Sequence, residues 1–329
     1  MRIIIIGNGS WGTALAIHFS RTHNTSLLTR NCKDAQKLNQ DRENKKYLTN
    51  YHFPDSLTID FIENIDCLSP YDLVIIATPM IAVRATLESL PVLKSTPILV
   101  ASKGFEKGTG LLPHQVVADI YPNNKSIGLL SGPTFAQELA SGLPSAICLS
   151  TDNLIWGKDI TKMLNNSTMR IYLNDDPIGV GVGGAVKNII AVASGFSDGK
   201  HVGNNARAAL ITRGLAEMTR LANSLGAKED TMRGLGTLGD LILTCTGNLS
   251  RNRQVGLKLA EGKNLQEILQ ELEHVAEGIN TLPEVLAIAK KNNVEMPITE
   301  MLSNLLTGKI SVDDVVETIM RRSPKIEGV

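Results

Sequence analysis

The sequence predicts an α/β domain followed by an all-α domain, and three observations lead to this prediction. Apolar runs typical of buried strands alternate with helical patterns through the first half of the chain. Strand patterns stop at residue 176, and only helical patterns follow. The length of 329 residues gives each half enough chain for its own core. We therefore predict an α/β domain at 1–176 and an all-helical domain at 177–329.

The chain opens on a strand that runs straight into a glycine-rich turn. Isoleucines at 3–6 precede Gly7, Gly9 and Gly12, and a helix of small residues follows. This spacing permits a tight turn, close approach of the backbone to a pyrophosphate, and close packing of the helix on the strand. The free N–H groups and the positive dipole end of that helix favour phosphates. The first domain is therefore predicted to be a Rossmann-type dinucleotide-binding domain.

The end of the next predicted strand, at 26–29, indicates which dinucleotide binds. A site for NAD places Asp or Glu there to hold the ribose 2′-hydroxyl, but this chain has Arg30 and Asn31. A guanidinium pairs with a 2′-phosphate better than with a hydroxyl. NADP(H) is therefore favoured, and NAD(H) is retained as an alternative because many exposed arginines are only solvated loop cations.

Five further apolar runs complete the predicted sheet, at 72–77, 97–103, 126–131, 145–151 and 169–174. Helical patterns at 81–90 and 135–141 alternate with them, as in a doubly wound domain. Thr134 and Gln137 match a capping box, which predicts a helix start at Phe135. Whether the later strands pair parallel or antiparallel is left open.

The second domain is predicted to consist of helices alone. They are expected at 178–197, 205–225, 252–260, 265–273, 282–292, 298–306 and 312–320. No flexible linker precedes them, so the two domains should pack tightly. A cofactor bound by the first domain would then place its reactive ring in the cleft that faces the second.

Composition excludes several classes of partner. Lys plus Arg and Asp plus Glu both number 33, so no net charge draws in nucleic acid or an acidic membrane. The cysteines and histidines show no metal-ligand spacing, and no metal is predicted. The apolar stretch 177–196 carries Lys187 and Asn188 at its centre, where a charge is costly in a bilayer. With no signal peptide, the chain is predicted to be soluble and cytoplasmic.

Lys187 is the most informative ionisable residue. The helical pattern around it is otherwise mostly glycine, alanine, valine and isoleucine, and Gly183, Gly184, Ala191 and Ser194 share its face. A second body can approach such a flat face closely, and burial lowers the pKa of an ammonium toward neutral pH. These properties suit a general acid or base for carbonyl reduction. The structural alternative is a lysine that caps carbonyls or reaches the surface.

Three other groups indicate a ligand in the same cleft. Lys103 follows a predicted strand at its carboxyl end, where open α/β sheets bind ligands. Asp240 lies in an apolar, glycine-rich segment and would pair with a cleft lysine. Arg251 and Arg253 occupy the first turn of a helix capped by Ser250, where they oppose the helix dipole. A bound anion such as a phosphate would compensate them, unless they are tolerated surface arginines.

The chain resembles a known family in six segments that occur in the same order and spacing. GNGSWGTA, ASKG, SGPTFAQE, VGGAVKN, GDLILTC and NLSRNR are similar to those of the bacterial soluble NAD(P)-dependent glycerol-3-phosphate dehydrogenases, over nearly the whole chain. The resemblance implies an NAD(P)-binding α/β domain joined to a helical domain. It also implies interconversion of dihydroxyacetone phosphate and sn-glycerol 3-phosphate for phospholipid synthesis, with a small phosphorylated substrate and a homodimer.

The resemblance further implies roles for individual residues, with Lys187 as the proton-transfer residue. Besides the three glycines of the turn, the dinucleotide would be contacted by Ser10, Trp11, Arg30, Lys103, Ala136, Arg251, Val275 and Glu277. The substrate would be contacted by Lys103, Gly132, Thr134, Lys187, Asp240, Ser250, Arg251 and Asn252. Thr134 stands where many relatives carry serine, and its hydroxyl is retained.

In the implied reaction a hydride passes from the reduced nicotinamide to C2 of dihydroxyacetone phosphate while Lys187 donates a proton to the carbonyl oxygen. The phosphate, held at Ser250, Arg251 and Asn252, supplies binding energy away from the reacting carbon. Two alternatives stay open. One is another two-domain reductase that uses a lysine, such as a 3-hydroxyacid or ketopantoate reductase. The other is a non-catalytic NADP(H) sensor, which would need no proton donor at Lys187.

Overall fold

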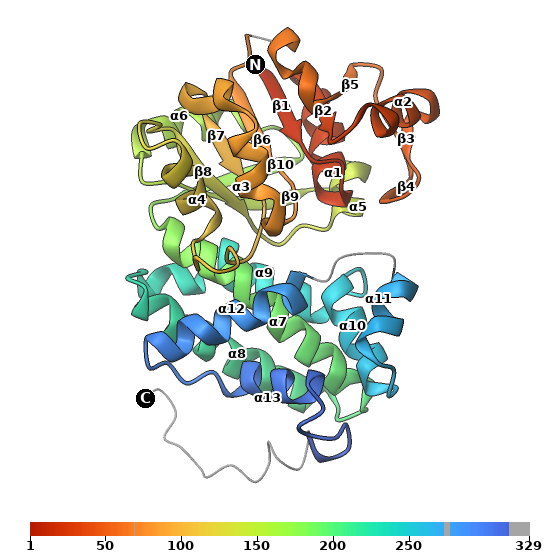
Figure 1. Ribbon diagram of the computed structural model, residues 1–329, viewed down its shortest axis with the longest axis vertical. Coiled ribbons are helices and arrows are strands. Elements are labelled where there is room, and N and C mark those ends of the chain that lie inside the picture. The colour runs from red at the N-terminus through yellow and green to blue at the C-terminus, as the bar shows by residue number, and fades with distance from the viewer. Residues whose placement is uncertain (69, 273–276, 316–329) are drawn as a thin grey trace.

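The computed structural model describes the chain except residues 69, 273–276 and 316–329. An α/β body formed by the first half of the chain stacks on a helical body formed by the second half (Figure 1). This arrangement confirms the predicted fold class, an α/β Rossmann-type dinucleotide-binding domain followed by an all-α C-terminal domain.

One eight-stranded sheet forms the centre of the α/β body. Its strands are β1 (Arg2–Ile6), β2 (Asn24–Thr29), β5 (Leu57–Phe61), β6 (Leu73–Ile76), β7 (Ile98–Val100), β8 (Ile127–Ser131), β9 (Ser145–Ser150) and β10 (Met169–Asn174). The spatial order is β10-β9-β8-β7-β6-β1-β2-β5. All neighbouring strands pair parallel except β8 and β9, which pair antiparallel. The question of strand direction that the sequence left open is therefore settled: β9 and β10 run against the other six.

Helices cover both faces of this sheet. One face carries α1 (Ser10–Ser20), α2 (Cys32–Asp41), α5 (Ala136–Ser141) and α6 (Leu154–Leu164), and the other carries α3 (Met80–Glu88) and α4 (Pro113–Ile120). The alternation along β1 explains the two cores, because Ile3 and Ile5 point into one and Ile4 and Ile6 into the other. Two 3₁₀ turns, η1 (Ile62–Leu68) and η2 (Pro91–Ser95), complete the connections.

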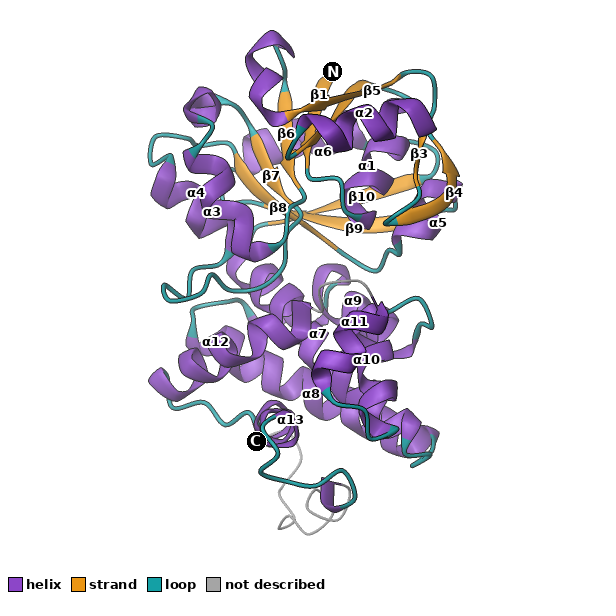
Figure 2. Cartoon of the chain, turned by 45° about the vertical axis from the view of Figure 1, so that its right-hand side comes forward, coloured by secondary structure: helices purple, strands orange, loops and turns teal. Residues whose placement is uncertain are grey.

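A small hairpin beside the first helix was not predicted. It consists of β3 (Glu43–Asn44) and β4 (Leu48–His52), and in Figure 2 it lies at the rim of the α/β body near α1 and α5. Only Asn44 and Leu48 are buried in the hairpin, and most of its residues are polar, so its sequence carries no apolar alternation. The edge strand β5 was also not predicted, although apolar residues alternate with polar ones along it.

The helical body is built around α7 (Pro177–Gly199), which is buried along most of its length. Around it pack α8 (Asn204–Ser224), α9 (Asp240–Thr246), α10 (Arg251–Ala260), α11 (Leu265–Leu272), α12 (Glu277–Lys291) and α13 (Pro297–Leu306) (Figure 2). A 3₁₀ turn, η3 (Glu229–Arg233), and a π-helical turn, η4 (Leu235–Gly239), precede α9. Asp176 caps α7, with Oδ1 accepting from the Gly179 amide at 2.8 Å and Oδ2 from the Lys228 amide at 2.8 Å.

The predicted helices of this body agree with the structure within two residues at most ends. The exception is α12, which begins at Glu277 rather than at 282, because Pro283 lies inside the helix and not at its start. The helix α9 and the turn before it were not predicted, since glycines at 234, 236 and 239 interrupt the pattern. The helix expected at 312–320 falls mostly outside the described residues.

The helix α7 is long and apolar enough to cross a membrane by length and composition, with a mean hydropathy of 1.4 in its most apolar window. However, 89% of that window is buried inside the protein. Backbone contact with α10 explains part of this burial, since a Cβ on Gly195 would lie 1.9 Å from the Arg253 carbonyl oxygen. The helix is therefore the core helix of this body.

Candidate active site

The glycine-rich turn lies at the point where the strand order reverses, between β1 and β6. Gly7 has a φ of 117°, and a Cβ there would lie 2.8 Å from the backbone of Ala77 at the end of β6. A Cβ on Gly12 would lie 1.9 Å from the Gly7 carbonyl oxygen, so this glycine allows α1 to pack on the turn. Around Gly9, in contrast, a Cβ would meet nothing within 4 Å. The space at Gly9 is on the side where a ligand meets the start of α1.

The β3–β4 hairpin holds this turn in place. The buried amide of Asn44 donates to the Asn8 carbonyl and to Thr13 Oγ1, both at 2.8 Å. Ser10 Oγ donates to the Tyr47 carbonyl at 2.7 Å. Because the Asn8 carbonyl belongs to the turn itself, Asn44 fixes the turn from outside. The sequence does not predict this contact, since nothing local distinguishes Asn44 from a solvated asparagine.

Three other residues assigned to the dinucleotide can be placed. Trp11 is half-buried on α1, and its Nε1 has no hydrogen-bond partner among the described residues. Arg30 follows β2, is exposed, and makes no hydrogen bond to the described residues. Ala136 is the first residue of α5, and it is half-buried against the core of the sheet. These positions leave polar groups available around the glycine turn and at the end of β2.

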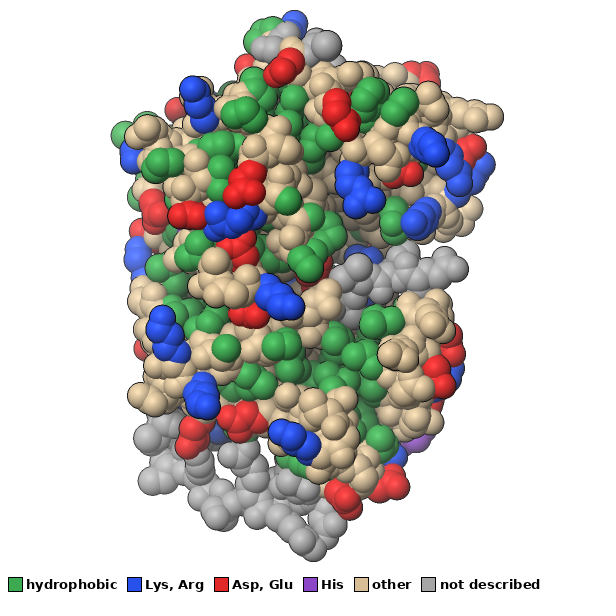
Figure 3. Space-filling model, viewed as in Figure 1, with side chains coloured by type: hydrophobic (Ala, Val, Ile, Leu, Met, Phe, Trp, Pro, Cys, Tyr) green, Lys and Arg blue, Asp and Glu red, His purple; other side chains and the backbone are tan. Residues whose placement is uncertain are grey.

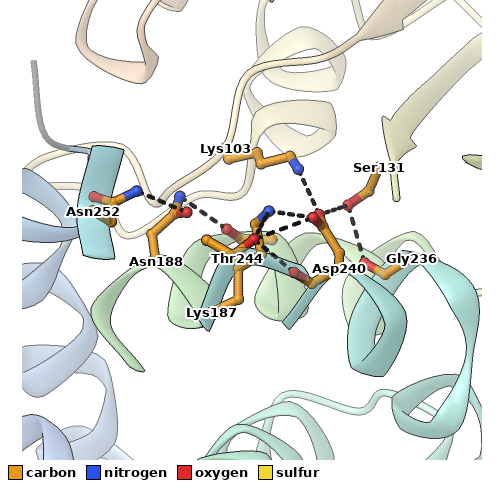
Figure 4. Close-up of polar contacts among 9 residues, drawn as sticks. Lys103, Ser131, Lys187, Asn188, Gly236, Asp240, Thr244 and Asn252 are labelled. Carbon is orange, nitrogen blue, oxygen red and sulfur yellow. Dashed lines mark hydrogen bonds and ion pairs between the residues drawn. The ribbon is translucent and has the colours of Figure 1, made fainter. Parts of the chain in front are cut away.

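A cluster of ion pairs joins the two bodies beneath the sheet (Figure 4). Asp240 Oδ2 accepts from Lys103 Nζ at 2.6 Å, and Asp240 Oδ1 accepts from Lys187 Nζ. Lys187 Nζ also donates to Thr244 Oγ1 at 2.9 Å. Ser131 Oγ donates to the Gly236 carbonyl at 3.0 Å and to Asp240 Oδ2 at 3.2 Å. Lys103 and Asp240 were expected to meet in the cleft with Lys187, whereas Thr244 and Ser131 were not assigned roles.

Local structure explains how these side chains meet. Lys103 and Ser131 stand at the carboxyl ends of β7 and β8, and Lys187 stands in the middle of α7. A Cβ on Gly184 would lie 3.5 Å from Lys103 Cγ, so the lysine chain lies over the flat face of α7. The π-helical turn η4 leads directly into α9, and Asp240 is the first residue of α9. Such turns are frequent at functional sites.

The cluster carries more positive than negative charge in a buried setting. Lys187 is 5% exposed and Asp240 is 2% exposed. Burial lowers the pKa of Lys187, the Asp240 carboxylate opposes this shift, and the Lys103 ammonium adds to it. Burial alone would raise the pKa of Asp240, but the two lysines outweigh burial and lower it. One ionised carboxylate therefore faces two lysines, and the surplus positive charge suits an anionic substrate or a developing alkoxide.

The start of α10 contains the second group of predicted residues. Ser250 caps the helix, with its Oγ accepting from the Arg253 amide at 3.3 Å. Asn252 donates to Asn188 Oδ1 at 3.0 Å and accepts from the Gly278 amide at 3.1 Å, so it ties α7 to α12. Arg251 is exposed and forms no ion pair within the described residues.

The expectation that both arginines of this turn need a bound anion is wrong for Arg253. Its Nη2 lies 2.7 Å from Asp198 Oδ2 and its Nε lies 3.0 Å from the same oxygen. Asp198, near the end of α7, is the compensating charge, and it also pairs with Arg207. Arg251 is therefore the arginine of the turn that forms no salt bridge with the described residues.

The segment after β8 lies beside the same cluster. Gly132 packs against β9, where a Cβ would lie 2.8 Å from Ile147 Cα. The predicted capping box between Thr134 and Gln137 does not form. The helix α5 begins at Ala136 with Phe135 at the N-cap position and no side-chain cap, and the buried Oγ1 of Thr134 has no partner among the described residues. The extended backbone at Phe135 displaces Thr134 from the capping position, so its hydroxyl stays buried without a partner among the described residues.

Glu277 lies across from Arg251 at the start of α12. Burial raises the pKa of Glu277 to about 7, and the Arg251 guanidinium opposes this rise. Arg251 keeps solvent access, yet the protein around it lowers the pKa of its guanidinium, as expected for a side chain in a cleft. Val275 lies outside the described residues. On the face shown in Figure 3, Lys and Arg side chains gather on the right-hand side of the upper body, above the level where the two bodies meet.

A different concavity runs along the edge strand β10. This groove, of about 590 Å³, is lined by Pro144, Ser145 and residues 165–173. It contains none of the predicted site residues. Its lining also includes no carboxylate and no lysine, so the lysine–aspartate cluster between the bodies is the better candidate site. No group of His, Cys, Asp and Glu among the described residues is arranged to hold a metal ion.

Comparisons with known proteins identify relatives of the whole chain. Two family models match the chain: the NAD-dependent glycerol-3-phosphate dehydrogenase N-terminus over residues 2–172 and the corresponding C-terminus over 176–317. A protein of Neisseria meningitidis named glycerol-3-phosphate dehydrogenase [NAD(P)+] is 50% identical, covering 99% of this chain and 100% of the relative. A relative of the same name from Dechloromonas aromatica is 46% identical, covering 99% of each chain.

A solved structure extends the likeness to three dimensions. The crystal structure of glycerol-3-phosphate dehydrogenase from Coxiella burnetii superposes with a TM-score of 0.90 at 38% identity, covering 98% of this chain and 99% of that one. The match therefore includes both bodies and the cleft between them.

Proposed function

The chain belongs to the family of NAD(P)-dependent glycerol-3-phosphate dehydrogenases, and we propose that it works as a reductase that converts dihydroxyacetone phosphate to sn-glycerol 3-phosphate. It is an oxidoreductase for which both NADP(H) and NAD(H) fit as cofactors. This membership decides between that activity and the other lysine-dependent reductases considered above. The observation that supports the reductive proposal best is the buried Lys187 with lowered pKa, bound to Asp240 beneath the carboxyl ends of the strands.

The residues around the glycine turn fit a dinucleotide. The open space at Gly9 lies where the start of α1 would meet a pyrophosphate. Arg30 is free to pair with a 2′-phosphate, which supports a preference for NADPH over NADH. We propose that the cofactor is held by Gly7, Gly9, Ser10, Trp11, Gly12, Arg30, Lys103, Ala136, Arg251, Val275 and Glu277. When bound, the reduced nicotinamide supplies the hydride.

Lys187 is proposed as the proton donor to the carbonyl oxygen of the substrate. Its ammonium is held by Asp240 and Thr244, which leaves one of its three N–H groups for the substrate. As the proton moves to the oxygen, the positive charge of Lys103 stabilises the developing alkoxide. Asp240 keeps both lysines in place and lowers the cost of their burial.

The start of α10 is proposed as the phosphate site. Ser250 accepts one bond from the Arg253 amide, so its hydroxyl hydrogen remains available to a phosphate oxygen. Arg251 supplies an exposed guanidinium that forms no salt bridge with the described residues, and Asn252 has a second amide hydrogen to donate. Gly132 and Thr134 complete the proposed substrate site, where the hydroxyl of Thr134 has no protein partner.

The first experiment measures consumption of NADPH and of NADH by the purified protein with dihydroxyacetone phosphate, for the wild type and for Lys187→Ala. We expect rapid turnover by the wild type and a loss of about 10²-fold or more in the variant, since a proton donor contributes 10²- to 10⁴-fold. NADPH binding by the variant, followed by cofactor fluorescence, should stay within about twofold because Lys187 lies on the substrate side. Near wild-type turnover by Lys187→Ala would remove the lysine from the reaction.

The same assay tests the Arg30 argument. The wild type should use NADPH more efficiently than NADH, and Arg30→Ala should remove about tenfold of that preference, as expected for one charge-assisted contact. An unchanged ratio of kcat/KM values in Arg30→Ala would assign cofactor preference to other residues.

We also propose a cytoplasmic enzyme that supplies phospholipid synthesis, a homodimer, and a division into domains at 1–176 and 177–329.

A further inference from the structure

Ser131 connects the sheet to the catalytic carboxylate from the opposite body. It is the last residue of β8 and is 6% exposed. Its Oγ lies 3.0 Å from the Gly236 carbonyl oxygen and 3.2 Å from Asp240 Oδ2, and both of those residues belong to the helical body (Figure 4). A hydroxyl has one hydrogen to donate, so this hydrogen is shared between a backbone carbonyl and a carboxylate.

The position of this hydroxyl matters because each oxygen of Asp240 serves a different lysine. Oδ1 accepts from Lys187 and Oδ2 accepts from Lys103 at 2.6 Å. A carboxylate can turn about its terminal torsion, which is broad and roughly two-fold. Such a turn would misplace both lysine contacts. Ser131 and Lys103 both reach Oδ2 from the α/β body, whereas Lys187 and Thr244 approach from the helical body.

We propose that Ser131 is a positioning residue for the proton-transfer step: its hydroxyl fixes the plane of the Asp240 carboxylate, so that Oδ1 stays directed at Lys187 when substrate enters. This inference rests on the proposed function, in which Lys187 is the proton donor. Ser131 touches neither reacting atom in this scheme and acts through Asp240.

A purely structural role of Ser131 predicts different effects of its substitution. Ser131 could simply tie the end of β8 to the turn η4 through the Gly236 carbonyl, and its loss would then lower stability without changing the chemistry. Ser150 provides a matched control. It is a fully buried serine on the neighbouring strand β9, and its Oγ donates to Asn174 Oδ1 at 2.9 Å. Ser150→Ala therefore removes an equivalent hydroxyl bond without touching Asp240.

The experiment compares pH profiles of kcat for the wild type, Ser131→Ala, Ser131→Cys and Ser150→Ala with dihydroxyacetone phosphate and saturating NADPH. For Ser131→Ala we expect kcat to fall about 10- to 100-fold, the cost of a small misplacement at the reacting centre. In a separate titration with NADPH, the KM for NADPH should stay within about twofold of the wild-type value. The pKa that governs kcat should fall by about half a unit or more, because a misdirected Oδ1 opposes the effect of burial on Lys187 less strongly.

Ser131→Cys keeps nearly the same shape and donates a hydrogen bond only weakly, so it should shift the profile in the same direction even if the alanine variant does not fold. Ser150→Ala should lower the Tm and leave the pH profile unchanged. If the Ser131 variants show only the behaviour of Ser150→Ala, the hydroxyl is structural and the proposal is wrong. Failure of the proposed function is distinguishable, since it would appear as an inactive wild type or an active Lys187→Ala variant.

Discussion

Arg251 and Arg253 show at the residue scale how two similar side chains acquire different roles. They stand in the same helical turn, but Arg253 lies 2.7 Å from Asp198, while Arg251 forms no salt bridge with the described residues and only faces the Glu277 carboxyl. Their sequence context could not separate them, because the compensating Asp198 is distant along the chain and only the crossing of α7 and α10 brings it near. The structure therefore assigns the free positive charge of this turn to Arg251.

The first prediction at this scale concerns Arg251→Ala. With dihydroxyacetone phosphate at saturating NADPH, KM should rise about 10- to 100-fold, as expected for loss of a hydrogen bond to a charged group. Activity on dihydroxyacetone, which lacks the phosphate, should change by less than about twofold at the same saturating cofactor. Steady-state kinetics on the two ketones would measure the difference.

The exposed Arg233 supplies the control, because its side chain pairs only with nearby Glu229 and Asp230. Arg233→Ala should leave both ketones unaffected. Equal losses on the phosphorylated and the phosphate-free ketone in Arg251→Ala would contradict a phosphate contact at this residue.

At the scale of elements, the glycines of the turn between β1 and α1 have two different roles. Gly12 is required by the packing of α1, whereas Gly9 leaves space for a ligand. A Cβ on Gly12 would lie 1.9 Å from the Gly7 carbonyl oxygen, which the backbone cannot accommodate without moving α1. A Cβ on Gly9 would meet nothing within 4 Å, and the φ of Gly9 is −68°, which any residue adopts. Protein packing therefore gives no reason for a glycine at position 9, whereas a closely bound pyrophosphate does.

This difference predicts opposite outcomes for two matched substitutions. Gly9→Ala should keep the wild-type Tm within a few degrees and weaken NADPH binding about tenfold or more, because the added methyl occupies the space of the pyrophosphate. Gly12→Ala should lower the Tm severely or prevent folding. Thermal unfolding without cofactor and titration with NADPH measure the two effects. Tight NADPH binding by a well-folded Gly9→Ala protein would show that the cofactor does not approach this residue.

The same scale shows what the sequence could reveal. The long apolar helix α7 and the glycine turn could be predicted, because each carries a strong local pattern. The β3–β4 hairpin could not, since its exposed polar residues have no periodicity, and yet its Asn44 fixes the turn through the Asn8 carbonyl. The capping box at Thr134 failed for a related reason: the local pattern was present, but the chain leaving β8 stays extended through Phe135.

At the scale of the whole molecule, the site exists only where the two bodies meet. Lys103 and Ser131 come from strand ends of the α/β body, and Lys187, Asp240 and Thr244 come from the helical body. The sequence could predict Lys103, Lys187 and Asp240 as members of one cleft, but it could not predict which oxygen of Asp240 each lysine would take. That assignment depends on how α7, α9 and the sheet are stacked, and local patterns do not encode this stacking.

Buried histidines and buried glutamates change the free energy of unfolding in opposite directions as the pH changes. Burial lowers the pKa of His18 and of His114 to about 4, and it raises the pKa of Glu217 and of Glu277 to about 7. Between about pH 4.5 and 6.5 the unfolded chain binds more protons at the histidines, so their contribution to the free energy of unfolding falls as pH falls. In the same window the folded protein binds more protons at the glutamates, so their contribution falls as pH rises.

A hydrogen bond between Asn166 and His18 also favours the neutral form of the His18 ring. Asn166 Oδ1 accepts from the Thr168 and Met169 amides at 3.0 and 2.8 Å, which orients its amide nitrogen toward His18 Nε2 at 2.9 Å. The ring nitrogen must then act as an acceptor, and a protonated His18 would face a donor with a donor. The neutral ring is therefore required by geometry as well as by burial.

Because these contributions oppose one another, the free energy of unfolding of the wild type should change little between about pH 4.5 and 6.5. It should change strongly in variants that lack either the histidines or a glutamate. Each full shift corresponds to about 3 kcal/mol, so two histidines and two glutamates should nearly cancel between about pH 4.5 and 6.5. A protein with both His18→Gln and His114→Gln should lose stability as pH rises through this window, because only the glutamate contribution remains. Glu217→Gln should instead lose stability as pH falls. Denaturation midpoints of the cofactor-free proteins at about pH 5 and about pH 6.5 measure the slopes, and slopes of the same sign in the two variants would contradict the balance.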